Sequence, residues 1–188
     1  STDKLSINTS LAANTSIAGG TNVGLKVKVD AVTGVYAYDV TVKVAGQTFT
    51  KRLTNDTAAD LGTITVNGDI MIKNADITVT PVAKLAVTGA SITKDGKSVT
   101  LTFNHELDAS TVTAANLALT STPADIDPNS IVVSGKTVTF GFINGNLANG
   151  DTITPNNNIK TADTPANACN GTVTKTVSVD ASGNYSIA

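Results

Sequence analysis

Apolar side chains recur at every second position along several short stretches of this chain. Val99, Leu101 and Phe103 point to one side of an extended backbone, and the threonines between them point to the other. The same alternation runs through residues 25–29 and 40–44, with lysine or threonine at the intervening positions. A period of two is typical of a strand with one buried face and one wet face. The sequence therefore predicts an all-β protein built from antiparallel sheets.

Turn-forming residues separate the predicted strands. Ala45-Gly46 and Asn67-Gly68 tolerate positive φ, so each is predicted to close a hairpin. One helical turn is expected at residues 109–115, where Asp108 or Ser110 would cap the first amides. The predicted strands are residues 4–9, 24–32, 37–44, 47–53, 62–66, 75–82, 86–93, 98–104, 116–120, 130–134, 137–142, 151–154 and 173–179.

The length of the chain suits two modules in series. At 188 residues it exceeds the roughly 100 residues of one β-sandwich. A proline at position 81 falls where one strand-like run gives way to another, so we place the boundary near Lys84. We predict a β-sandwich over residues 1–83, a second over 84–180, and a tail or linker over 181–188. The start at Ser1 suggests a mature form or a fragment of a longer protein.

The second half of the chain resembles a known class of module. In bacterial Ig-like modules of S-layer and other secreted surface proteins, a strand ending in Thr-Phe is followed by a characteristic series of short motifs. The resemblance covers roughly residues 87–179, and the first half matches in its strand pattern only. The motifs here are Thr102-Phe103, Leu107-Asp108, Ser110-Thr111-Val112, Thr113-Ala114-Ala115-Asn116 and Leu117-Ala118-Leu119.

This resemblance implies two tandem Ig-like β-sandwich domains and a structural function. The expected role is a spacer in a secreted bacterial cell-surface or S-layer protein that contacts other modules without catalysis. Expected partners are neighbouring modules or copies of the same surface protein, with cell-wall polysaccharide or a host protein also open. The core is expected at Val27, Val42, Leu101, Phe103, Val138 and Phe140.

Composition argues against several other classes of function. A formal net charge of −2 offers no basic stripe for nucleic acid. The apolar runs are far shorter than the roughly 20 residues that span a bilayer, so no membrane span is expected. His105-Glu106 is predicted to lie on a solvated turn, because a second histidine for a metal or acid–base site is missing. Cys169 is the single cysteine and is expected to be structural. We do not expect an enzyme.

Four aspartates are the only candidates for a metal site. Asp125, Asp127, Asp151 and Asp163 lie in predicted loops that could converge at one end of the second sandwich. Loop carboxylates are ligands that Ca²⁺ prefers, although no Asp-x-Asp-x-Asp-Gly loop is present. Calcium is thus possible, and no other cofactor is predicted.

Two tyrosines provide the alternative function. Tyr36 and Tyr38 are two apart on one predicted strand, so they would share a face and could present their rings to a sugar. Cross-strand packing at the edge of the first module is the competing and favoured interpretation. If the rings are exposed, the chain would be an adhesin domain or an accessory carbohydrate-binding module of a secreted protein.

Overall fold

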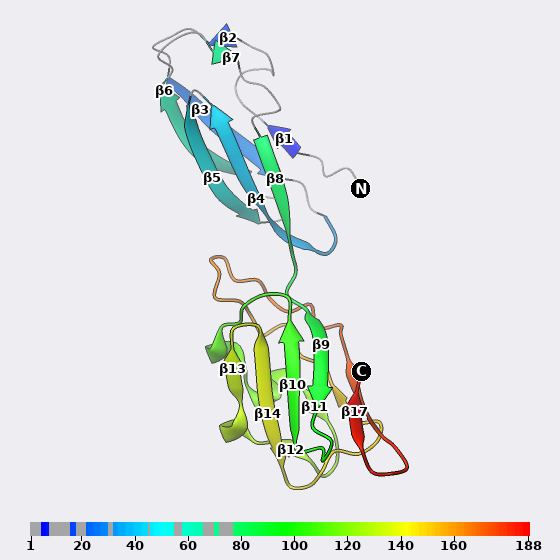
Figure 1. Cartoon of the computed structure of the whole chain (residues 1–188). Helices are drawn as coiled ribbons and strands as arrows, with labels where there is room; N and C mark the ends of the chain where they lie inside the picture. The colour runs from blue at the N-terminus through cyan, green and yellow to red at the C-terminus, as the bar shows by residue number, and fades with distance from the viewer. Residues whose placement is uncertain are drawn as a thin grey trace. The chain divides into compact units, whose positions relative to one another are not determined.

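The protein is predominantly β, and the sheets formed by its described residues are antiparallel, as the alternation predicts (Figure 1). The computed structural model describes residues 5–7, 16–17, 22–29, 32–44, 46–54, 58–65, 70–71 and 77–188, and side chains within 32–43, 46–54 and 78–188. The chain divides into unit 1, Ser1–Ala83, and unit 2, Lys84–Ala188. Among the described residues, no helix is long and apolar enough to cross a membrane.

The described residues of unit 1 form two three-stranded sheets and one two-stranded pair. The first sheet has the order β1-β3-β6, the second has the order β5-β4-β8, and β2 pairs with β7. The strands are β1 (Leu5–Ile7), β2 (Ser16–Ile17), β3 (Asn22–Val29), β4 (Val35–Val44), β5 (Gln47–Thr54), β6 (Ala58–Thr65), β7 (Ile70–Met71) and β8 (Ile77–Ala83).

Strand β4 is the centre of its sheet because one of its faces is apolar. Tyr38, Val40 and Val42 are all buried, whereas Asp39 and Thr41 between them are partly exposed and Lys43 after them is exposed. Gly46 has φ +74°, a conformation that glycine adopts without steric cost, and it lies in the turn from β4 to β5. The β4–β5 hairpin predicted from Ala45-Gly46 is thereby confirmed. The predicted hairpin turn at Asn67-Gly68 lies outside the described residues.

Unit 2 contains two larger sheets. One has the order β12-β14-β10-β9, with β13 also paired to β14, and the other has the order β11-β15-β16-β17. Their strands are β9 (Val87–Ile92), β10 (Ser98–Phe103), β11 (Leu119–Thr120), β12 (Asp125–Ile126), β13 (Val132–Ser134), β14 (Thr137–Ile143), β15 (Thr152–Ile153), β16 (Lys175–Val179) and β17 (Tyr185–Ile187).

The core of unit 2 forms on the inward side of β10 and β14. Leu101, Phe103, Val138 and Phe140 are at most 1% exposed, so four of the six predicted core positions are confirmed in this unit. Val42 is buried in unit 1, and the side chain of Val27 is not among those described. The other core members come from both sheets and from the loops between them: Leu85, Val87, Val99, Leu107, Val112, Leu117, Ala124, Ile126, Leu147, Ile153, Ile159, Cys169 and Val177.

The helical segment differs from the single turn that was predicted. A 3-10 turn, η2 (Ala109–Thr111), is capped by Asp108, and a separate turn, α1 (Ala114–Leu117), is capped by Thr113. The strand expected at 116–120 therefore begins only at Leu119. A third turn, η3 (Pro128–Ser130), has Asp127 as its cap and was not predicted. Local capping by polar side chains decides these boundaries.

Residues 181–188, expected as a tail or linker, belong to unit 2. They contain β17, which pairs with β16 through a turn closed by Asp180, whose carboxylate accepts from the amides of Ser182 and Asn184. The Tyr185 ring lies directly over Gly96, where an added Cβ would come within 2.7 Å of the ring. The Tyr185 hydroxyl donates to the Leu147 carbonyl at 3.0 Å. These contacts attach the end of the chain to the rest of the unit.

Candidate functional site

The first residues of unit 2 are held by the side chain that follows strand β10. The side-chain amide of Asn104 donates to the Lys84 carbonyl at 2.8 Å, and its side-chain oxygen accepts from the Ala86 backbone amide at 2.9 Å. The Asn104 backbone amide also donates to the Ala86 carbonyl at 3.1 Å. One asparagine thus pairs with the backbone on both sides of Leu85.

Leu85 is held from the opposite direction by the loop that precedes β16. The side-chain oxygen of Asn167, itself 1% exposed, accepts from the Leu85 amide at 3.0 Å. The Asn170 amide donates to the Leu85 carbonyl at 2.9 Å, and Leu85 forms a parallel bridge with Cys169. We call Lys84–Ala86 together with Asn104, Asn167 and Asn170 the entry clamp.

The loop that carries Asn167 is itself fixed. The Thr161 amide donates to the Asn167 carbonyl at 3.0 Å, and the Asn167 amide donates to the Thr161 hydroxyl at 3.0 Å. Thr161 is 2% exposed. Buried polar groups whose hydrogen bonds are satisfied in this way favour one arrangement, because any other arrangement leaves donors without acceptors. The entry clamp is therefore a specific structure.

Cys169 lies inside this clamp and is buried. Burial raises the pKa of its thiol above the ordinary value, and its Sγ lies 3.7 Å from the Pro155 carbonyl oxygen. The thiolate is the reactive form of cysteine, so a raised pKa makes this side chain unreactive. Its contacts are those of a small apolar core residue.

Three of the four predicted calcium ligands organise loops. Asp125 accepts from the side-chain amide of Asn144 at 3.0 Å, and Asp127 accepts from the backbone amide of Asn129 at 2.9 Å. Asp151 accepts from the backbone amide of Ala148 and from the Ser121 hydroxyl. Asp163 is exposed in the bend at 162–165. Within the described part of the chain, no three potential metal ligands come together. A calcium ion at these residues stays a prediction without a ligand cluster to hold it.

The two tyrosines do not form an exposed pair. Tyr38 is 2% exposed, and Tyr36 is half-buried. A register shift between Val35 and Ala37 on β4 interrupts the alternation at Tyr36, so spacing by two does not guarantee a shared face there. Only Tyr36 keeps part of its surface accessible to a ligand.

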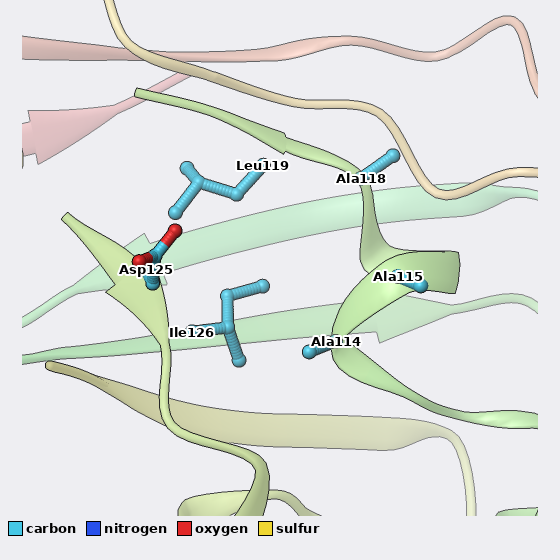
Figure 2. Close-up of a pocket in the computed structure, with 6 residues that line it drawn as sticks. All are labelled: Ala114, Ala115, Ala118, Leu119, Asp125 and Ile126. Atoms are coloured by element: carbon cyan, nitrogen blue, oxygen red, sulfur yellow. The ribbon is translucent and has the colours of Figure 1, made fainter. Parts of the chain in front are cut away.

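A small hollow opens at the edge of unit 2 between α1 and β12 (Figure 2). It has a volume of about 290 Å³, near the lower limit for small-molecule sites. Three alanines, at 114, 115 and 118, line one side, and Leu119 and Ile126 extend the apolar wall. Asp125 is the one ionisable residue among those that line it. The hollow supplies apolar contact and one carboxylate, a set without a base–nucleophile pair.

The entry clamp was not found by sequence reasoning. Asn104 and Asn167 are isolated asparagines in a chain rich in this residue, and no spacing links them to each other or to Leu85. His105 and Glu106, by contrast, lie on the turn after β10 where they were expected. No protein-family model matches the chain, and searches of curated proteins and of solved structures found no match.

Proposed function

We propose that this chain is a structural module of a bacterial cell-surface or S-layer protein. In this proposal its two units are tandem Ig-like β-sandwich domains that space and contact neighbouring modules without turning over a substrate. The motif resemblance over residues 87–179 supports the surface assignment. The two antiparallel sheets of unit 2 around one apolar core are consistent with it.

The entry clamp is the observation that carries this proposal. A spacer in a surface layer must keep its shape under tension, and tension along the chain enters unit 2 through Lys84. At this point five hydrogen bonds with Asn104, Asn167 and Asn170 hold the backbone of residues 84–86. Forced unfolding is governed by the unfolding rate, so contacts that must break together at the point of loading slow it most.

Single-molecule force spectroscopy on the full chain, with handles at both ends, tests the mechanical role. Asn167→Ala removes the acceptor of the Leu85 amide and should lower the unfolding force of unit 2 at a given loading rate. Asn158→Ala is the matched control, because Asn158 is exposed and makes only a 3.4 Å side-chain contact with Asn116. Equal unfolding forces for wild type, Asn167→Ala and the control would contradict a mechanical role for the entry clamp.

A binding module is the second candidate, supported by the accessible part of Tyr36 and by the hollow beside Asp125. A glycan array with wild type and Tyr36→Ala separates the two functions. Tyr38 should be left in place, because truncating a buried ring would unfold unit 1 and abolish any binding indirectly. Specific glycan binding that disappears in Tyr36→Ala would defeat the purely structural function.

A further inference from the structure

The larger sheet of unit 2 has a second face, turned away from the core. Residues opposite each other in an antiparallel ladder share a face, and burial of Leu101 and Val138 fixes which face is inward. The strands β13, β14, β10 and β9 lie side by side in Figure 1. We define the outward face by the alternate residues Gly89, Ser91, Ser98, Thr100, Thr102, Val132, Ser134, Thr137, Thr139, Gly141 and Ile143. Asp125, on the edge strand β12, borders this face opposite Ile143 and also lines the hollow beside α1.

The chemistry of the outward face is uniform. Its members are almost all threonine, serine, glycine or aliphatic residues, and the Thr100 and Thr139 hydroxyls are 2.9 Å apart. Val132 and Ile143, 60% and 43% exposed, are the exposed large apolar residues of the described chain, and both belong to this face. Val132 lies opposite Thr139, four residues along β14 from Ile143, so the two apolar side chains are spread over a face that carries little charge.

Two charges mark opposite ends of one edge of this face. β12 pairs with the Ile143 end of β14, so Asp125 lies at that end. β13 pairs with the Thr137 end of β14, and Lys136 is in the turn that joins the two strands there. Six residues of extended chain separate the ends, roughly 20 Å. Asp125 accepts a hydrogen bond from the neutral side-chain amide of Asn144, and Lys136 is exposed.

This arrangement is complementary to itself. Consider two copies packed face to face and related by a two-fold axis that lies in the contact plane and runs perpendicular to the strands. The strands of the two copies then run in opposite directions, and the edge that carries β12 and β13 in one copy faces the same edge of the other. Asp125 of one copy then comes opposite Lys136 of the other, and the pairing occurs twice by symmetry. The neutral residues between the charges meet without like-charge repulsion, as sheets packed face to face do.

We propose that the outward face is a lateral contact surface that binds the same face of a second copy of this chain. The inference rests on the proposed structural function and names its partner. Three strands of six or seven residues, with the short strands β12 and β13 along one edge, give a footprint of roughly 400 Å². This is about half of what each partner contributes to a stable complex. A single contact is therefore weak, with Kd near the millimolar range, and becomes effective where modules are held close together in an array.

Charge reversal in the full chain tests this pairing. Asp125→Lys or Lys136→Asp alone places like charges opposite each other twice, and should weaken self-association about 5- to 30-fold. The double variant Asp125→Lys/Lys136→Asp restores opposite charges and should return the affinity to within about 2-fold of wild type. Val132→Glu should also weaken association. The readouts are concentration-dependent NMR shifts of β10 and β14 amides and sedimentation equilibrium up to about 2 mM.

Matched controls reverse charges on exposed loops away from this face, at Lys160→Asp and Asp163→Lys. Both should associate like wild type, and melting curves should show every variant folded. Self-association that the single reversals weaken and the double variant restores supports the proposal. Absence of self-association up to 2 mM, or association that the single reversals leave unchanged, overturns it. Either negative result leaves the force experiment on Asn167, and with it the proposed function, unaffected.

Discussion

The outward faces of the central sheets in units 1 and 2 differ in how their side chains are paired. In unit 1, Asp39 on β4 lies opposite Arg52 on β5, and the guanidinium donates two hydrogen bonds to the carboxylate at 2.8 and 3.0 Å. In unit 2, the corresponding central pair is Thr100 with Thr139, which share one hydroxyl contact. Both sheets have inward faces made of buried apolar residues.

This difference shows that the inward and outward positions of a strand carry separate information. The inward side must be apolar to form a core, so it is similar in the two units. The outward side is free to vary. In unit 1 the Asp39–Arg52 ion pair lies beside a Thr41–Thr50 hydroxyl contact, whereas the central pair in unit 2 is joined by hydroxyl groups alone. Experiments that act on one side at a time can measure how far this separation holds.

The largest effect is expected from the inward side of unit 2. Phe103→Ala removes a ring that is 1% exposed and should lower the free energy of unfolding of unit 2 by about 3–5 kcal/mol. Val40→Ala in unit 1 removes less volume and should cost about 1.5–3 kcal/mol. Urea unfolding followed through NMR signals of each unit measures both. A loss below about 1 kcal/mol for Phe103→Ala would remove this residue from the core.

The next effect concerns a buried polar group. Asn167→Ala leaves the Leu85 amide without its acceptor and should destabilise unit 2 by about 1–3 kcal/mol. Asn158→Ala, an exposed change of the same kind, should cost less than about 0.5 kcal/mol. Urea unfolding at neutral pH checks the pair. Equal losses would show that the entry clamp contributes no stability.

A smaller effect, with a pH dependence, is expected from the outward face of unit 1. The hydrogen bonds from Arg52 hold the pKa of Asp39 below its ordinary value. Because the folded pKa is lowered, the ion pair stabilises unit 1 above the unfolded pKa of about 3.9, and this contribution is lost as the pH falls through the folded pKa. For a partly exposed pair the contribution is about 0.5–1 kcal/mol.

Arg52→Met should therefore destabilise unit 1 at pH 7 and have a smaller effect at pH 2, because the ion-pair contribution is lost as the pH falls through the lowered pKa of Asp39. Urea unfolding of unit 1 at both pH values provides the measurement. Lys43→Met, which changes an exposed cation on the neighbouring strand β4, is the control. A loss of stability that is the same at pH 7 and pH 2 would assign the effect to packing of the arginine stem.

The smallest effect is expected from the outward face of unit 2. Thr139→Val keeps the shape of the side chain and removes one hydroxyl of the Thr100 pair, so it should change stability by less than about 1 kcal/mol. The double variant Thr100→Val/Thr139→Val should be close to neutral, because neither position then keeps a hydroxyl without its partner. Thermal unfolding of the three proteins tests this order, and a large loss for the double variant would contradict it.

Much of the fold could be predicted because it depends on local alternation. The strands at 98–103 and 137–143, and the hairpin of β4 and β5, follow from periodicity and from glycine in the turn. Prediction was weaker where short polar contacts decide. The 116–120 segment begins as a helical turn because Thr113 caps it, and residues 181–188 form a strand because Asp180 closes a turn and Tyr185 packs on Gly96.

The arrangement of the candidate site residues was the hardest feature to predict, because it depends least on neighbouring residues in the sequence. Tyr36 and Tyr38 are correctly spaced for a shared face, but a bulge that involves β8 changes that relation. Asn104 and Asn167 contribute to the entry clamp from positions 63 residues apart, and nothing in their neighbours indicates that both reach the backbone around Leu85.

By itself, the sequence determined that this protein forms antiparallel sheets with an apolar side, because alternation is a property of consecutive residues. Only the tertiary structure decided which asparagines hold Leu85 and which two charges lie at the ends of one edge. Those relations join residues far apart in the chain, and they exist only once the strands have paired in a particular order and register.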